Sequence, residues 1–235
     1  MLMAIECSGI CGGVALLEEE RLVGCVNFTS STLHSQRLLP SLEWLLARTG
    51  RRIQDVRAVG VSKGPGSFTG LRVGMSMAKG IALAQGIPIV GICSLEALAL
   101  RAAAYTRLKL VCPILDARQG YVYAALYRIG NLLEDGFPQM EVVHEPAALH
   151  IEELLPWIQE PTLFTGDGLA AHSDVLATTL GDHFHRANAV GLVPSAEQVA
   201  VLAARRLRRG ETDNIHTLEP FYLRHGYMEK SAKHS

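Results

Sequence analysis

The sequence predicts an α/β protein in which one arrangement of elements occurs twice. Each half of the chain has the pattern of three adjacent strands followed by alternating helices and strands. No low-complexity stretch separates the halves, and the segment that joins them near residue 106 is short. Of the 235 residues, 49% are hydrophobic, which is enough to fill the cores of two small lobes that share an interface.

The first half is predicted as β-β-β-α-β-α-β-α. Its strands are short apolar runs bounded by glycines or acidic turns, and its helices carry leucine or alanine at helical spacing. Gly50 and Gly86 end the first two helices, because glycine readily adopts the left-handed conformation that follows a helix. In chain order, the predicted elements cover residues 2–7, 14–17, 22–28, 33–49, 56–62, 69–85, 87–92 and 95–105.

The second half repeats the order β-β-β-α-β-α and adds a last helix. The strand at 120–128 alternates in polarity before a turn at Asn131, and Ser195 is a suitable N-cap for the last helix. In chain order, the predicted elements cover residues 109–116, 120–128, 139–143, 147–158, 162–165, 169–180 and 196–209.

This element order is that of a ribonuclease-H-like layer. Two tandem copies predict the duplicated arrangement shared by actin, hexokinase and Hsp70. We place an N-terminal lobe at residues 1–106 and a smaller, more divergent C-terminal lobe at residues 107–235. The fold class by itself does not fix the function.

Composition excludes several classes of protein. The net charge is −1, so the chain lacks the basic excess of stand-alone nucleic-acid binders. The five cysteines form no Cys-x-x-Cys motif, and four of them lie in apolar runs. The N-terminus has no signal-peptide pattern, and no apolar run reaches the roughly 18 residues that a membrane helix needs. We therefore expect a reduced, cytoplasmic protein without membrane contact.

A glycine-rich run between a predicted strand and a predicted helix is the most informative segment. Glycine lets the backbone turn sharply and approach its neighbours closely. The run could cradle an anion or phosphate at the helix N-terminus, or it could be a tight turn that packs against a neighbouring segment. It is not a P-loop, because the required Gly-Lys-Ser/Thr ending is absent. The signature residues are Lys63, Gly64, Pro65, Gly66, Ser67, Phe68, Thr69, Gly70 and Arg72.

The helix after this run has small residues at a spacing of four. One row consists of Gly70, Gly74, Ala78, Ala82 and Gly86, and a second consists of Ser76, Gly80 and Ala84. Glycine inside a helix is about 1 kcal/mol less favourable than alanine, so close backbone approach is expected in return. One row would meet the sheet. The other would meet another subunit, or the predicted helix at 33–49 within the same lobe.

Four segments resemble the bacterial TsaB (YeaZ) family, which belongs to the glycoprotease-like superfamily together with TsaD. The most specific is Lys-Gly-Pro-Gly-Ser-Phe-Thr-Gly-Leu-Arg-Val-Gly at residues 63–74. The others are His-Ser-Gln-Arg-Leu-Leu-Pro at 34–40, Leu-Asp-Ala-Arg-Gln-Gly-Tyr-Val-Tyr at 115–123 and Pro-Phe-Tyr-Leu-Arg at 220–224. They occur in the expected order and span nearly the whole chain.

The resemblance implies a non-catalytic scaffold or activator without independent activity. Such a subunit works with a TsaD-type catalytic subunit and a TsaE-type ATPase. The complex transfers threonylcarbamoyl to the adenosine beside the anticodon of ANN-decoding tRNAs. The resemblance further implies docking to TsaD through a helical bundle on the N-terminal lobe, homodimers through the same surface, and contact with tRNA only through the complex.

Carried onto this chain, the docking surface falls on the helices at 33–49 and 69–85. The candidate contacts are the apolar and small residues that recur along these helices. They are Leu38, Leu42, Leu45, Leu71, Met75, Ala78 and Ala82.

The sequence departs from the catalytic relatives at two points. His34 is followed four residues later by Leu38, so the His-x-x-x-His metal pair of the TsaD family is absent and no metal is expected. Glu6 stands where kinases of this fold keep an aspartate. Glu6, Asp116 and Asp167 form at most a weak cleft for ATP or ADP, and no cofactor of its own is expected. A glycoprotease-like metallopeptidase and a kinase of the same fold are the alternatives.

Overall fold

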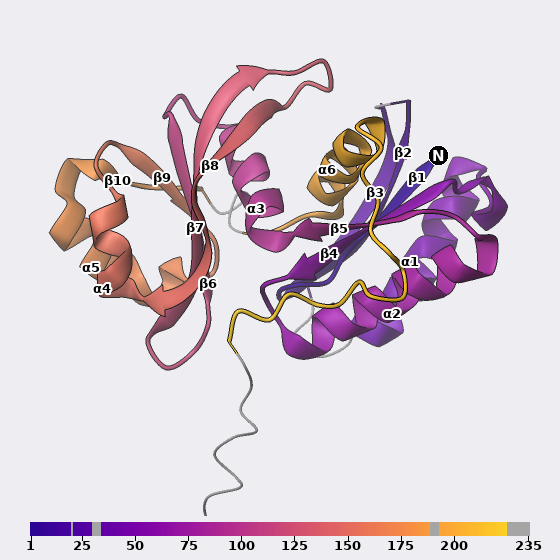
Figure 1. Ribbon diagram of the computed structural model, residues 1–235, viewed down its shortest axis with the longest axis horizontal. Helices are drawn as coiled ribbons and strands as arrows, with labels where there is room; N and C mark the ends of the chain where they lie inside the picture. The colour runs from indigo at the N-terminus through magenta and orange to yellow at the C-terminus, as the bar shows by residue number, and fades with distance from the viewer. Residues whose placement is uncertain (20, 30–33, 189–192, 225–235) are drawn as a thin grey trace, which may run out of the picture.

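The computed structural model describes residues 1–19, 21–29, 34–188 and 193–224, which form two mixed five-stranded sheets (Figure 1). The strand orders are β3-β2-β1-β4-β5 and β8-β7-β6-β9-β10. In each sheet the first three strands pair antiparallel and the next two join in parallel. The prediction of two ribonuclease-H-like lobes in an actin-like duplication is therefore confirmed.

The elements alternate along the chain much as their hydrophobic periodicity predicts. The strands are β1 (Leu2–Glu6), β2 (Cys11–Glu18), β3 (Arg21–Thr29), β4 (Ala58–Gly64), β5 (Ile89–Cys93), β6 (Leu110–Asp116), β7 (Tyr121–Leu132), β8 (Pro138–His150), β9 (Thr162–Thr165) and β10 (Phe184–Arg186). The helices are α1 (His34–Thr49), α2 (Phe68–Gln85), α3 (Ser94–Ala103), α4 (Ile151–Leu154), α5 (Leu169–Leu180) and α6 (Ala196–Arg208). Short 3₁₀ turns occur at Ile53–Asp55, Leu155–Trp157 and Gly181–His183.

The first sheet is buried on both faces. Met3 and Ile5 of β1 point into one core with α1 and α2, whereas Leu2 and Ala4 point into a second core with α6. Alternate residues of a strand face opposite sides of a sheet, so a central strand covered on both sides is apolar throughout. Figure 1 shows α1 and α2 side by side on the outer face of this sheet.

Helix α6 packs on the first sheet, although it follows all the strands of the second in sequence. Val199, Ala200 and Ala203 lie in the core that holds Leu2 and Ala4. Gly60 of β4 permits the approach, because a Cβ there would lie 2.7 Å from the Cβ of Ala203. Residues 196–208 thus cover the first lobe, whereas chain order places them in the C-terminal lobe at 107–235. Sequence order therefore does not decide which sheet this helix covers.

Helix α3 makes the opposite crossing. Its Leu95, Leu98 and Ala99 pack with Val111 and Tyr127 of the second sheet. The same helix contacts α6, so α3 and α6 lie between the two sheets. The remaining face of the second sheet is covered by α4 and α5.

The predicted helix at 147–158 is wrong over its first four residues. Strand β8 continues to His150, pairing Ala147 with Ala124 and Ala148 with Tyr123. Alanine favours helix locally, but pairing with the long strand β7 overrides this weak preference. No helix within the described ranges is long and apolar enough to cross a membrane.

Candidate functional site

A cleft of about 580 Å³ opens between the lobes where their central strands end. One wall consists of the turn after β1 and the start of α2, and the other consists of the residues after β6 and β9. Clefts at the carboxyl ends of parallel strands are the usual ligand position in open α/β sheets. The lining residues are Ser8, Gly9, Ile10, Gly66, Ser67, Phe68, Thr69, Gly70, Val73, Leu115, Asp116, Ala117, Arg118, Tyr123 and Asp167.

The glycine-rich segment packs against the turn after β1. Gly66 and Gly70 each lie so close to it that an added Cβ would overlap the carbonyl oxygens of Ser8 and Cys7. The Ser67 amide donates to the Ser8 carbonyl over 2.7 Å, and the Ser67 hydroxyl caps α2 by accepting from the Gly70 amide. Close packing is thus sufficient reason for these glycines. A role as an anion cradle stays a prediction.

Glu6 lies beneath this turn and does not line the cleft. Its carboxylate is fully buried and accepts hydrogen bonds from the amide and hydroxyl of Ser8. Its second oxygen has no partner among the described residues. Burial raises the pKa of Glu6, and burial together with Glu6 raises the pKa of the Cys7 thiol to about 12. Glu6 therefore holds the shape of the turn from inside the lobe.

Asp116 and Asp167 do meet in the cleft, as the sequence predicts. The Asp116 amide donates to the Asp167 carboxylate over 2.9 Å. The Asp116 carboxylate accepts from the Arg118 amide and lies 3.3 Å from the Arg118 guanidinium. Burial raises the pKa of Asp167, and the hydrogen bond from the Asp116 amide opposes this rise. Of the three predicted cleft carboxylates, two share one wall and Glu6 lies apart.

A C-terminal segment, residues 211–224, crosses from the first lobe to the second. We call it the strap. The Phe221 amide donates to the Lys63 carbonyl, and Leu218 is buried in the core of the first lobe. Tyr222 contacts the signature segment: its ring lies 5.2 Å from that of Phe68, and its hydroxyl accepts from Arg72.

Arg224 carries the strap onto the second lobe. Its guanidinium donates to the carbonyls of Ala117 and Arg118 and lies 4.2 Å from the centre of the Tyr121 ring. Three of the four segments that resemble the TsaB family, at 63–74, 115–123 and 220–224, therefore meet at one edge of the cleft. The sequence marks these segments individually but carries no signal that they touch.

The predicted docking residues lie on the wrong faces of their helices. All seven are at most 4% exposed, and they pack into the first lobe. Leucines at helical spacing mark the face that a helix buries, and here that face meets the sheet. The buried residues are Leu38, Leu42, Leu45, Leu71, Met75, Ala78 and Ala82.

The outward faces of α1 and α2 carry a different set of apolar side chains. Leu39 and Trp44 of α1 are 52% and 55% exposed, and Leu83 of α2 is 56% exposed. Gly80 also faces outward, and a Cβ there would meet nothing within 4 Å. The row of Ser76, Gly80 and Ala84 is thus the exposed row, whereas the row through Gly74 and Ala78 packs inward.

No group of three or more histidine, cysteine, aspartate or glutamate side chains is placed to hold a metal ion within the part of the chain that the structure describes. His183 is half-buried in a 3₁₀ turn, and His185 is exposed on β10. The side chain of His34 lies outside the described residues.

Comparison with known proteins gives a consistent set of relatives. A family model described as TsaD, tRNA N6-adenosine threonylcarbamoyltransferase, matches residues 18–232. The tRNA threonylcarbamoyladenosine biosynthesis protein TsaB of Bacillus subtilis is 33% identical over 95% of this chain and 93% of its own length. The Escherichia coli protein of the same name is 32% identical over 84% of this chain and 83% of its own length.

Solved structures show the same likeness. YeaZ from Pseudomonas aeruginosa superposes with a TM-score of 0.80 at 29% identity, covering 94% of this chain and 99% of that one. A second structure from Pseudomonas aeruginosa, an uncharacterized protein with similarity to peptidase YEAZ, gives a TM-score of 0.81 at 30% identity over 95% of this chain and 99% of that one.

Two glycines of α2 should respond to alanine in opposite directions. Gly70→Ala should destabilise the protein by about 1–3 kcal/mol, because the new methyl group overlaps the Cys7 carbonyl. Gly80→Ala should stabilise it by about 0.5–1 kcal/mol, because the site is open and alanine favours helix. Urea unfolding followed by circular dichroism measures both. Equal effects would mean that the signature loop does not pack as described.

Glu6→Gln should change how stability depends on pH. The unfolded chain releases the Glu6 proton near the ordinary pKa of 4.5, whereas the folded protein holds it to a higher pH. Wild type therefore loses stability as pH rises from the ordinary to the raised pKa, and the uncharged variant does not. The difference in free energy of unfolding, variant minus wild type, should therefore increase as the pH rises from the ordinary to the raised pKa of Glu6. An exposed control, Glu43→Gln, should track wild type, and parallel curves for Glu6→Gln would contradict the buried carboxylate.

Proposed function

The chain belongs to the TsaB (YeaZ) family of tRNA threonylcarbamoyladenosine biosynthesis proteins, and we propose that within this pathway it is a non-catalytic subunit that docks and activates the transferring enzyme. Its partners in this proposal are a TsaD-type catalytic subunit and a TsaE-type ATPase. The product is threonylcarbamoyladenosine beside the anticodon of ANN-decoding tRNAs, and this chain meets tRNA only through the complex. The proposal includes a cytoplasmic setting, in accord with five free cysteines.

The observation that carries the proposal is the apolar outward face of α1 and α2. Leu39, Trp44 and Leu83 are each more than half exposed on two helices that pack side by side. Large apolar side chains left exposed on two neighbouring helices favour a protein–protein contact, and tryptophan is prominent among the residues that dominate binding energy. We call this the outward helical face.

The geometry of that face favours a partner that presents helices of its own. A pair of helices docks most closely onto a second pair, forming a four-helix contact. Gly80 at its surface offers room for close approach, which explains a glycine inside an exposed helix. A related subunit with an equivalent helix pair fits this description, and in its absence a second copy of this chain would occupy the same face.

The interlobe cleft supports an accessory role. In a kinase of this fold an acidic side chain after the first strand faces the nucleotide, whereas Glu6 is buried beneath the turn and engaged by Ser8. Asp116 is occupied by Arg118 and by contact with Asp167. Weak binding of ATP or ADP stays a prediction for this cleft.

Trp44→Asp should abolish docking and leave the fold intact. A charge in the centre of an apolar contact is desolvated without a partner, so we expect a loss of about 2 kcal/mol or more, roughly 30-fold in Kd. Pull-down and calorimetry with the TsaD-type subunit of the same genome measure it. The matched control is Val142→Asp, since Val142 is 50% exposed but lies on β8 of the other lobe. Loss of binding in the control alone would move the docking site to the second sheet.

Reconstitution tests the role itself. Purified chain, TsaD-type subunit, TsaE-type ATPase, ATP, tRNA and the threonylcarbamoyl-adenylate donor should give modified tRNA. Omission of this chain should remove the activity, and Trp44→Asp should reproduce the omission. Full modification in its absence would exclude the proposed role, and modification by this chain alone would make it an enzyme.

A further inference from the structure

A second cavity between the lobes, of about 540 Å³, shares no lining residue with the cleft described above. We propose that it binds a small multivalent oxyanion, a molecule that carries phosphate or carboxylate groups. No residue of α1 or α2 lines it, so the proposal stands apart from docking. The lining residues are Lys63, Gly91, Ile92, Cys93, Glu96, Leu133, Gln139, Met140, Leu202, Arg205, Arg206 and Arg209.

Lys63 is the signature residue that the packing of the glycine-rich segment leaves unexplained. Its side chain extends into this cavity and not into the cleft that Gly66 and Gly70 line. Its stem lies along Gly91 of β5, where a Cβ would stand 3.1 Å from the Lys63 Cδ. The half-buried ammonium group has no hydrogen-bond or ion-pair partner among the described residues. A glycine therefore makes room for a lysine that has no direct hydrogen-bond or ion-pair partner among the described residues, and whose charge acts at longer range on Glu96.

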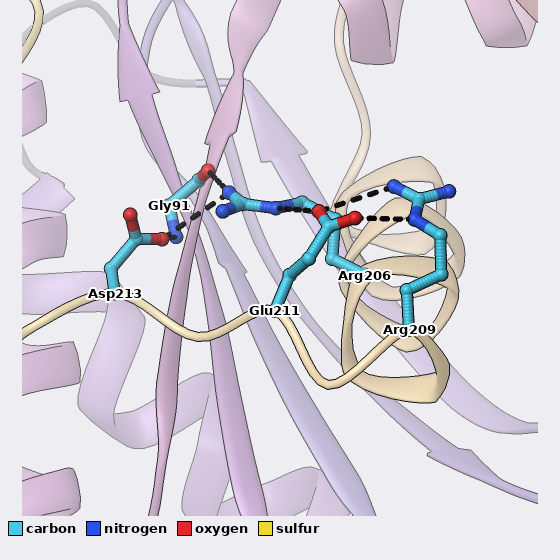
Figure 2. A network of polar contacts seen from close by, with 5 residues as sticks. All are labelled: Gly91, Arg206, Arg209, Glu211 and Asp213. Carbon is cyan, nitrogen blue, oxygen red and sulfur yellow. Dashed lines mark hydrogen bonds and ion pairs between the residues drawn. The ribbon is translucent and has the colours of Figure 1, made fainter.

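Two arginines at the end of α6, Arg206 and the C-cap residue Arg209, line the same cavity as this lysine. Figure 2 shows the contacts that hold them. The Asp213 carboxylate accepts from the Gly91 amide over 2.8 Å and from Arg206, which also donates to the Gly91 carbonyl over 2.8 Å. Glu211 accepts from Nε of Arg206 and, over 2.6 Å, from Nε of Arg209. Within the described part of the chain, these contacts leave Nη2 of Arg206 and Nη1 of Arg209 without an acceptor. The strap thus holds two guanidinium groups rigidly and leaves donors available.

The donors left over in this wall are cationic, although carboxylates pair with its three arginines. Lys63, Arg205, Arg206 and Arg209 line the cavity, and Glu96 is the one acidic residue that does. Burial raises the pKa of Glu96, and the neighbouring cations Arg206, Arg205, Arg209 and Lys63 oppose that rise. Arg205 is already committed, since it is bound to Asp135 over 2.6 Å and to two carbonyl groups. Lys63, Arg206 and Arg209 are the groups left to bind.

Preorganised guanidinium and ammonium donors recognise oxyanions through charge-assisted hydrogen bonds. The three groups come from β4 and from the C-terminal end of α6 with its cap residue Arg209. The opposite wall, with Leu133 and Gln139, comes from the second lobe. A ligand here would therefore touch both lobes. The volume of the cavity, about 540 Å³, allows a small metabolite and excludes a macromolecular chain.

Isothermal titration calorimetry of the full chain with pyrophosphate and with citrate tests the proposal. Binding of either to wild type is expected, and the stronger of the two identifies phosphate or carboxylate as the preferred group. Lys63→Met should weaken binding about 10-fold or more, because it removes a charge-assisted hydrogen bond. Lys63→Arg should retain most of it, which separates loss of charge from loss of fold, and circular dichroism checks each variant.

Two controls locate the site. Lys79→Met removes a lysine of α2 that lines neither the 540 Å³ cavity nor the 580 Å³ cleft. Arg118→Met removes the exposed cation of that cleft, which we call the front cleft. Both should bind as wild type does. Absence of binding by wild type at millimolar anion, or binding that is unchanged in Lys63→Met, overturns the proposal. Binding lost in Arg118→Met and kept in Lys63→Met places the anion in the front cleft and overturns it equally.

Discussion

The exchange of two helices between the sheets is the constraint on which the rest of the structure depends. Helix α6 completes the core of the first lobe and α3 completes that of the second, and the two helices touch. Separating the lobes would expose apolar surface of both, so the lobes behave as interlocked parts. The cleft and the second cavity both lie along this interface, and the exchanged helices thereby set the spacing of their walls.

Three of the segments by which the family is recognised contact one another in the folded chain, and this contact is the physical reason for their residues. Glycine at 66 and 70 allows the start of α2 to lie against the turn after β1, and the strap then binds the exposed side of the same segment. Arg224 extends this contact to the turn after β6. Residues separated by about 150 positions in sequence are thus parts of one junction between the lobes. The docking surface that we propose does not include this junction, because the outward helical face lies on the other side of α2.

Periodicity in the sequence predicts the strands, most helices and the duplication, because burial of alternate or every third to fourth residue leaves a local pattern. It does not predict which sheet α6 covers, since its small side chains would suit either. The same pattern misleads in the search for the docking surface that we propose. Leu38, Leu42 and Leu45 give the clearest stripe on α1 because they fill the core, whereas Leu39 and Trp44 look like scattered surface residues. The surroundings of Lys63 are equally hard to predict, because Gly91, Arg206 and Arg209 share a cavity with it only in the folded chain.

The exchange of helices also has a consequence for synthesis on the ribosome. The inner face of the first sheet, with Leu2, Ala4, Ala15 and Leu17, lacks most of its cover until residues 196–208 have emerged, because α3 is the only earlier helix of the described chain that contributes to this core. The N-terminal lobe therefore cannot complete its core as its own strands are synthesised. For most of translation it exposes an apolar surface of the kind that chaperones bind. A chain interrupted before α6 would keep all of its first sheet and still lack the cover that protects that sheet from aggregation.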